Sequence, residues 1–296
     1  MPTTVITGAN SGIGRAAALH LAAAGHRVFG TMRSLDKGEK LAALAGEAGV
    51  DVTPIVLDVT DSQGVTDGFA EIIEAAGTVD VLVNNAGIGS NAAIEDIDIE
   101  RDKAVFDANV WGPVRCAQAV LPTMRAQGSG HIVQISSIAG RIGVPGQPIY
   151  SASKWALEGM SENMAHDLAV HGIRVSIVEP GVTRTAILGK NPDWPTPTEY
   201  ADTYGRMFDI YATGIMANVR AETVAQTIQD CIDAPSGQLR WPVAWGADEL
   251  VAARMGGGVT DEEWIELGAL ADDPVAWRER FEQLFGLPLI SATGNG

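Results

Sequence analysis

The feature that most constrains this fold is a regular alternation of short β-branched segments with longer helical patterns. Runs rich in valine and isoleucine are followed by alanine-rich or charged stretches of helical periodicity through most of the first 245 residues. Such an alternation favours a parallel sheet that helices cover on both faces. No internal repeat or low-complexity linker interrupts the series. We therefore predict an α/β fold, a doubly wound parallel sheet in a single domain.

The boundaries of the expected elements follow from the same patterns. Glycines such as Gly25 mark helix ends, and β-branched runs mark strands. Strands are expected at 5–7, 27–32, 52–59, 79–87, 131–137, 173–181 and near 239–245, and helices at 15–25, 35–49, 62–77, 99–127, 150–172 and 221–233.

Composition excludes several classes of function. The chain is 46% hydrophobic and 19% charged, which is typical of a globular protein, and its net charge of −17 disfavours nucleic acid and anionic membranes as partners. The histidines form no HxxxH or HExxH pair, so we expect no metal site. Cys116 and Cys231 lie far apart and are typical of thiols in a reducing compartment. With no run of membrane-spanning length and only MPTT before the first apolar residues, we expect a cytoplasmic protein.

A glycine-rich loop, TGANSGIG at residues 7–14, joins the first expected strand to the first helix. A helix N-terminus offers free N–H groups and a partial positive charge to a phosphate, and glycine lets the backbone approach that phosphate closely. Ligands of open α/β sheets bind at the carboxyl ends of the strands. We expect the loop to cradle the pyrophosphate of a dinucleotide in a Rossmann-like fold. A tight turn without a ligand is the alternative.

Further motifs follow in a fixed order along the chain. They are NNAG at 84–87, Asn109, Ser137 thirteen residues before a tyrosine, the YxxxK pair at 150 and 154, and PG at 180–181. With TGxxxGIG, these motifs resemble the short-chain dehydrogenase/reductase family over residues 3 to 245. The resemblance implies a nicotinamide-dependent oxidoreductase. Residues 246–296 lie outside it.

Tyr150 and Lys154 are four residues apart and therefore share one face of a helix. A free tyrosine has a pKa of about 10, and lowering it by roughly 3 units requires about 4 kcal/mol. An ammonium about 4 Å away, at an effective dielectric near 20, supplies roughly that much. We predict that Tyr150 is a general acid–base poised by Lys154. The alternative is a surface pair on an amphipathic helix.

The resemblance implies roles for the neighbouring residues. Ser137 hydrogen-bonds the substrate oxygen, with Ser136 as its rival. Asn109 holds a water that links Lys154 to solvent in a proton relay, the alternative being an asparagine at a helix kink. Lys154 also binds the nicotinamide ribose.

The resemblance also implies the cofactor contacts. Asp58 contacts the adenine amino group, the alternative being a cap on the following helix. The loop at 180–185 grips the nicotinamide carboxamide. The full predicted cofactor set is Gly8, Asn10, Ser11, Gly12, Ile13, Gly14, Arg33, Asp58, Val59, Asn85, Ala86, Gly87, Tyr150, Lys154, Pro180, Gly181, Val182, Thr183 and Thr185.

The end of the second expected strand indicates which cofactor is bound. An NAD site places an acidic residue there to take the ribose hydroxyls, whereas this strand ends at Met32 and Arg33. A guanidinium can pair with a 2′-phosphate through two hydrogen bonds. Asp36 lies too far along and favours the next helix N-terminus. We expect NADP(H), with NAD(H) possible and Arg33 as a solvated loop residue as the alternative.

Residues 186–220 break the alternation and are expected to form a lid over the substrate. Tyr200, Tyr204, Phe208 and Tyr211 are spaced as one stripe of a helix, which is either core packing or the apolar face of that lid. With Ile187, Leu188 and Trp194 before it, the lid indicates a bulky apolar substrate. We expect residues 1–245 to form the catalytic domain and 246–296 a helical extension packed on it.

We therefore predict an NADP-dependent alcohol dehydrogenase or carbonyl reductase, and the family resemblance implies a homodimer or homotetramer. Two other functions remain open. One is a dinucleotide sensor without catalysis, which would have no need of Ser137, Tyr150 and Lys154. The other is an isomerase or dehydratase of the extended branch, which typically shows TGxxGxxG instead of TGxxxGIG.

Overall fold

The computed structural model describes residues 1–185, 199–235, 237–270 and 273–292. Its centre is a seven-stranded sheet of order β3-β2-β1-β4-β5-β6-β7, in which every neighbouring pair is parallel. The order reverses direction between β1 and β4, which creates the crevice where open α/β sheets bind ligands. The predicted doubly wound sheet is confirmed. The strands are β1 Thr3–Ile6, β2 Arg27–Met32, β3 Val52–Val56, β4 Val81–Asn84, β5 Gly130–Ile135, β6 Ile173–Pro180 and β7 Arg240–Val243.

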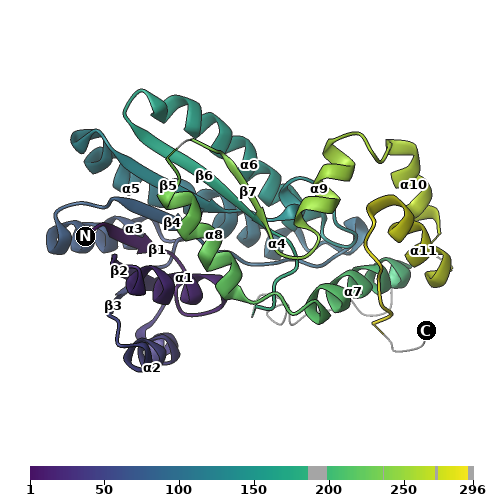
Figure 1. Ribbon diagram of the computed structural model, residues 1–296, viewed down its shortest axis with the longest axis horizontal. Helices are drawn as coiled ribbons and strands as arrows, with labels where there is room; N and C mark the ends of the chain where they lie inside the picture. Colours follow the sequence, from purple (N-terminus) through teal and green to yellow (C-terminus); the bar gives the residue numbers. More distant parts are fainter. Residues whose placement is uncertain (186–198, 236, 271–272, 293–296) are drawn as a thin grey trace.

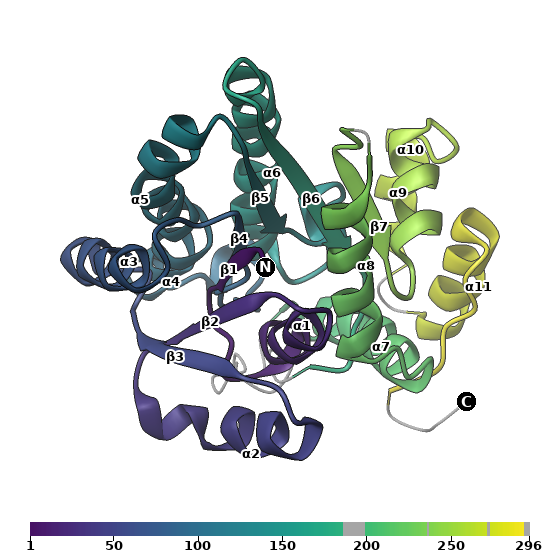
Figure 2. The same ribbon diagram turned by 60° about the vertical axis from the view of Figure 1, so that its left-hand side comes forward.

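Helices cover both faces of this sheet (Figure 2). α1, α2 and α8 pack on one face, while α3, α5 and α6 pack on the other. The helices are α1 Gly12–Ala23, α2 Glu39–Ala48, α3 Ser62–Ala76, α4 Ile99–Phe106, α5 Gly112–Gln127, α6 Pro148–Ala169, α7 Ala201–Met216, α8 Ala221–Asp233, α9 Ala247–Met255, α10 Asp261–Ala269 and α11 Pro274–Phe285.

Consecutive residues of a strand pack against opposite helix layers, because side chains alternate between the two faces of a pleated strand. Val5 and Phe29 lie in the cluster under α3, α5 and α6, whereas Ile6 and Val28 lie in the cluster under α1 and α8. All four side chains are buried. Burial on both faces stabilises the sheet by about 25 cal/mol for each Å² of apolar surface, and it holds the strand ends rigidly for the site.

The helix expected over 99–127 is continuous but not regular. α4 ends at Phe106, a π-helical turn spans Asp107–Trp111, and α5 begins at Gly112. Single π turns inside α-helices are frequent at functional sites. Here the turn carries Asn109, which is almost completely buried.

The C-terminal helices form a separate layer beyond β7, beside α7 (Figure 1). Trp277, Phe281 and Phe285 of α11 are buried and pack against one another. The guanidinium of Arg278 lies 2.9 Å from the carboxylate of Asp209 on α7, so this layer is bound to the catalytic domain.

Candidate active site

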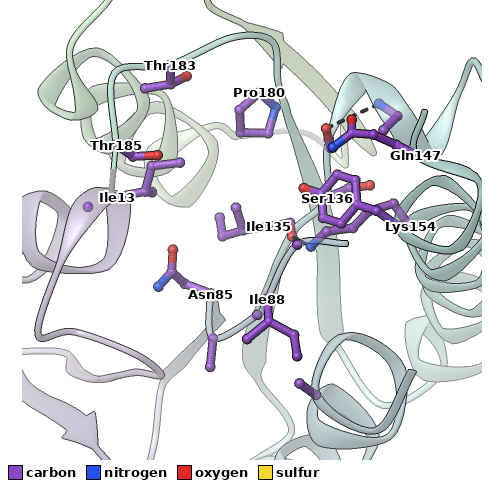
Figure 3. Close-up of a pocket in the computed structure, with 18 of the residues that line it drawn as sticks. Ile13, Asn85, Ile88, Ile135, Ser136, Gln147, Lys154, Pro180, Thr183 and Thr185 are labelled. Carbon is purple, nitrogen blue, oxygen red and sulfur yellow. Dashed lines mark hydrogen bonds between the residues drawn. The ribbon is translucent and has the colours of Figure 1, made fainter. Parts of the chain in front are cut away.

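A cavity of about 450 Å³ lies at the carboxyl ends of β1, β4, β5 and β6, a size typical of small-molecule sites. Figure 3 shows Ile13, Thr183 and Thr185 on one side of it and Ser136 and Lys154 on the other. Every site residue predicted from the sequence lines this cavity except Gly14 and Asn109, which stand behind its wall.

The glycine loop has the backbone that close approach of a phosphate requires. Gly8 and Gly12 have φ of +68° and +54°, in the left-handed region that favours glycine. A Cβ on Gly14 would lie 2.4 Å from Asn85 Nδ2 and 2.5 Å from the carbonyl oxygen of Gly8. Gly14 therefore permits close packing of the loop against Asn85, which follows β4, and α1 begins at Gly12 with its N-terminus at the cavity.

The loop after β6 lies beside the glycine loop, on the same side of the cavity (Figure 3). A Cβ added to Gly12 would lie 3.4 Å from Cβ of Thr185, so the two loops approach each other closely. Gly181 is required there, because a Cβ on it would lie 2.0 Å from the carbonyl oxygen of Trp245. Together, two glycine-containing turns and a helix N-terminus on one cavity fit a dinucleotide.

Asp58 lines this cavity. Its Oδ1 accepts hydrogen bonds from N and Oγ1 of Thr60, at 3.0 and 2.8 Å. The cap of α3 is Asp61, which accepts from the backbone N of Gln63 at 3.1 Å. Asp58 is therefore not the cap of the following helix. Its contact with adenine stays a prediction.

Two cations lie where the second strand ends. Arg33 is exposed and lines the cavity, and so does Lys37, one turn later. Met32 is buried, with Sδ 2.7 Å from a Cβ that would be added to Gly38, and it lines the cavity beside Arg33. Asp36 does not line the cavity, and a hydrogen bond with Ser34 lowers its pKa. Sequence reasoning missed Lys37, although its spacing from Arg33 was visible.

Tyr150 and Lys154 lie together on α6, as their spacing predicts. Lys154 Nζ lies 5.8 Å from the centroid of the Tyr150 ring and donates a hydrogen bond to the carbonyl oxygen of Ile135 at 2.9 Å. Burial lowers the pKa of Lys154 to about 8, and the charge of Glu158 acts in the opposite direction.

The predicted lowering of the Tyr150 pKa by Lys154 is wrong for this arrangement. Burial of the phenol raises the pKa of Tyr150, and a hydrogen bond with Ser137 opposes that rise only in part. The ammonium of Lys154 is directed to the Ile135 carbonyl, so it does not offset the loss of water around the phenol. Tyr150 is consequently protonated at neutral pH and suited to donate a proton.

The surroundings of Ser136 and Ser137 indicate which of the two could contact a substrate. Ser137 interacts with the Tyr150 phenol, and its Oγ accepts a hydrogen bond from the backbone N of Ala139 at 3.2 Å. Ser136 is directed toward Glu158, since a Cβ on Gly140 would lie 2.8 Å from Ser136 Oγ and 3.0 Å from Glu158 Cγ. The geometry favours Ser137 as the residue that orients a substrate oxygen.

Hydrogen bonds of the Asn109 side chain link the segment after β4 to α6. Its Oδ1 accepts from the backbone N of Ile88 and its Nδ2 donates to the Ile88 carbonyl, both at 2.9 Å. Nδ2 also reaches Ser153 Oγ at 3.1 Å, and that hydroxyl donates to the Tyr150 carbonyl. Asn109 thus occupies a helix irregularity and also positions the catalytic helix. Its role in a water relay stays a prediction.

The far end of the cavity is apolar and comes partly from the C-terminal extension. Leu250 of α9, Trp264 of α10 and Phe281 of α11 line it, and they pack in one cluster with Ile142 and Val144. Sequence reasoning missed these three residues, because they belong to no motif and only the tertiary fold brings them to the site.

The aromatic stripe on α7 serves two purposes. Tyr211 lines the cavity. Tyr204 is buried, its hydroxyl donating to Asp96 and accepting from the backbone N of Ala93, both at 2.7 Å. Tyr200 bonds Glu95 at 3.0 Å. Most residues of the stripe therefore pack against the rest of the fold. Ile187, Leu188 and Trp194 lie outside the described residues.

In the described part of the chain, no three histidine, cysteine or acidic side chains are grouped so as to hold a metal ion. None of the described helices is both long and apolar enough to cross a membrane. Cys116 and Cys231 are buried and not joined to each other.

Residues 2–196 match the short chain dehydrogenase family model. The chain belongs to this family. It is 37% identical over 268 residues to oxidoreductase BOA17 of Botryotinia fuckeliana, covering 88% of this chain and 96% of that protein. It is also 44% identical over 192 residues to human retinol dehydrogenase 8, covering 64% of this chain and 61% of that protein.

Solved structures agree with this family assignment. A short-chain dehydrogenase from Streptomyces avermitilis superposes with a TM-score of 0.77 at 33% identity, over 92% of this chain and 96% of that one. A metagenomic short-chain oxidoreductase in complex with NADP gives 0.66 at 27% identity, over 82% and 96%. A Burkholderia phymatum relative in complex with NAD gives 0.71 at 27% identity, over 81% and 87%. The chain is a short-chain oxidoreductase that depends on NAD or NADP.

Proposed function

We propose that this enzyme interconverts a carbonyl group and a secondary alcohol on a bulky apolar substrate, with NADP(H) as the cofactor. The observation that carries the proposal is that Ser137, Tyr150 and Lys154 line the same cavity as the glycine loop and a set of apolar side chains. A sensor would have no need of this group of residues. The TGxxxGIG loop argues against an isomerase or dehydratase of the extended branch.

The mechanism follows from the protonation states. The bound cofactor supplies or accepts a hydride at the substrate carbon. In the reduction direction, Tyr150 Oη donates the proton to the substrate oxygen, and its raised pKa keeps that proton available. Ser137 hydrogen-bonds the same oxygen and orients it. Lys154 supplies positive charge beside the phenol and a donor for the ribose hydroxyls.

Cofactor preference rests on charge. The 2′-phosphate is anionic and the protein carries a net charge of −17, so long-range attraction is absent and a local cation must select it. Arg33 and Lys37 provide two such cations at the same end of the cavity. The lack of an acidic side chain at Met32 removes the repulsion that an NAD-type site would exert.

Substrate class rests on the apolar side chains of this cavity. Tyr211, Leu250, Trp264 and Phe281 present apolar surface there. One relative is named a retinol dehydrogenase, and retinol is a large apolar alcohol. Both facts support a bulky apolar ketone or alcohol.

We also propose a homodimer or homotetramer in the cytoplasm. Trp111, the last residue of the π turn, and Trp155 of α6 have 54% and 47% of their area exposed, and exposed tryptophans support an interface between subunits. Sedimentation of the purified protein tests the oligomeric state, and a monomer at micromolar concentration would refute it.

The deciding experiment is a panel of ketones and alcohols assayed by the absorbance of the reduced nicotinamide, with both cofactors. We expect turnover of aryl or steroid-like ketones with NADPH. Preference for sugars or short hydroxy acids would refute the substrate class. Cofactor binding with no turnover of any compound would support a sensor.

A further inference from the structure

A second cavity, of about 490 Å³, adjoins the active-site cavity. The two share five lining residues, Gly143, Val144 and Pro145 from the loop before α6, Trp264 of α10 and Phe281 of α11. The active-site cavity therefore borders a second, more open hollow at these shared residues.

The walls of this second cavity suit a hydrocarbon. Ile94, Pro148, Leu267 and Trp277 line it beside the shared residues, and the polar groups among its described residues are few. Arg206 is one of these, and it donates a hydrogen bond to the carbonyl oxygen of Gly268 at 2.8 Å, joining α7 to α10.

Among the five shared residues, the aromatic side chains of Trp264 and Phe281 are held by neighbours, whereas Gly143 leaves open space. Trp264 is held between the guanidinium of Arg254, 5.4 Å from its ring, and the edge of Phe285, 6.2 Å away. Phe281 is held by Trp277 at 5.3 Å. On the other side, a Cβ added to Gly143 would meet no atom of the described residues within 4 Å. A chain passing between the cavities therefore has room at Gly143.

We propose that the substrate is a long-chain ketone or alcohol whose reactive carbon lies at Tyr150 and whose alkyl tail passes Gly143 and Trp264 into the second cavity. This inference rests on the proposed oxidoreductase function and narrows its substrate class from bulky to elongated. Trp264 and Phe281 are then the residues that set chain-length specificity.

The test is a series of methyl alkyl ketones of about four to sixteen carbons. Each methylene that enters the second cavity is expected to raise kcat/KM by up to about fourfold, until the cavity is filled. In Gly143→Leu the added side chain occupies the open space at this position. The ratio of kcat/KM for the longest to the shortest ketone should fall at least tenfold.

Two further variants keep the test decisive. Gly268→Trp places bulk at the second cavity alone, and it should reduce the same ratio if Gly143→Leu does not fold. Gly46→Leu adds the same side chain to an exposed helical glycine of α2 with no atom within 4 Å, and it should leave the ratio unchanged. A flat dependence on chain length in the wild type overturns the inference while leaving the oxidoreductase function intact.

A binding measurement separates the inference from the function on which it rests. Without cofactor, a long-chain ketone should raise the melting temperature of the wild type and of Gly46→Leu, but not of Gly143→Leu. If no ketone or alcohol is turned over but this pattern appears, the proposed function fails and the tail site stands. A shift of equal size in all three proteins would show that the second cavity is only a packing space.

Discussion

Glu158 follows Lys154 by one turn of α6, and its buried carboxylate raises the pKa of the lysine against the effect of burial. Glu158 is held by Arg240, whose Nε lies 3.2 Å from its carboxylate and 3.4 Å from that of Glu179. Arg141 completes the cluster, 3.2 Å from Glu179. Burial and the nearby Glu158 raise the pKa of Glu179 to about 7. A charged cluster thus stands directly behind the catalytic lysine.

The first prediction concerns the pH dependence of activity. Lys154 has a lowered pKa of about 8, so it loses its charge as pH rises through that value, and carbonyl reduction should decline above it. Glu158→Gln removes a group that raises this pKa, so the decline should move to lower pH. The measurement is kcat/KM for reduction against pH.

Glu162→Gln is the matched control for that profile. Glu162 also contacts Arg240, at 3.3 Å, but its side chain is mostly exposed. Its removal should leave the pH of the decline in place. Equal shifts in both variants would show that Arg240, and not Glu158, governs the charge of Lys154.

The second prediction is that Tyr150→Phe abolishes turnover. The ring retains its packing beside Lys154, and only the hydroxyl that interacts with Ser137 is lost. General acid–base catalysis contributes about 10²–10⁴-fold, so kcat should fall at least a hundredfold. NADPH affinity, measured by cofactor fluorescence, should stay within a few-fold. Retention of more than about a tenth of kcat would assign the proton transfer to another residue.

The third prediction is that Arg33→Ala weakens NADPH binding and barely affects NADH. A hydrogen bond to a charged group contributes about 1.5–3 kcal/mol, or roughly ten- to a hundredfold in affinity. Lys37→Ala should have a smaller effect of the same sign, because an ammonium lacks the paired donors of a guanidinium. Titration of each variant with both cofactors gives the answer. A wild type with equal kcat/KM for NADH would refute the preference.

The fourth prediction concerns the glycine loop. Gly14→Ala would place a methyl group 2.4 Å from Asn85 Nδ2 and 2.5 Å from the Gly8 carbonyl. Overpacking of this kind costs about 1–3 kcal/mol, and it displaces the loop that receives the cofactor. Urea unfolding and NADPH titration should both show a loss.

Gly46→Ala provides the control on α2. Its methyl group meets no atom within 4 Å, and the exchange of glycine for alanine in an exposed helix should stabilise the protein by about 0.5–1 kcal/mol. Cofactor affinity should not change. A stable Gly14→Ala protein with normal affinity would mean that the loop tolerates a side chain there.

Sequence patterns predicted the sheet and the glycine-loop side of the site well. The sheet depends on local periodicity, and the loop depends on glycines at positions where a side chain would not fit. The helix over 221–233 has the expected bounds, and Arg33, Tyr150 and Lys154 line one cavity as expected. The irregular turn at Asp107–Trp111 was weighed only as a kink at Asn109, since nothing in the local sequence identifies a π turn.

The chemistry of Tyr150 was predicted less well than its position. Its spacing from Lys154 established that the two are neighbours, but the pKa depends on how much water the folded chain removes from the phenol. This loss of water depends on the tertiary structure and not on the local sequence. The same limit explains why Leu250, Trp264 and Phe281 could not be assigned to the site from residues 246–296 alone.

The outer wall of the active site is made by a segment that begins after the last strand. The residues proposed for hydride and proton transfer precede position 186, whereas Leu250, Trp264 and Phe281 belong to helices that follow β7. Variation in these helices can therefore change which molecules are accepted without disturbing the reaction itself. Substitutions in α9, α10 and α11, whether natural or from a directed library, could therefore change the substrate range while the proposed reactive residues stay the same.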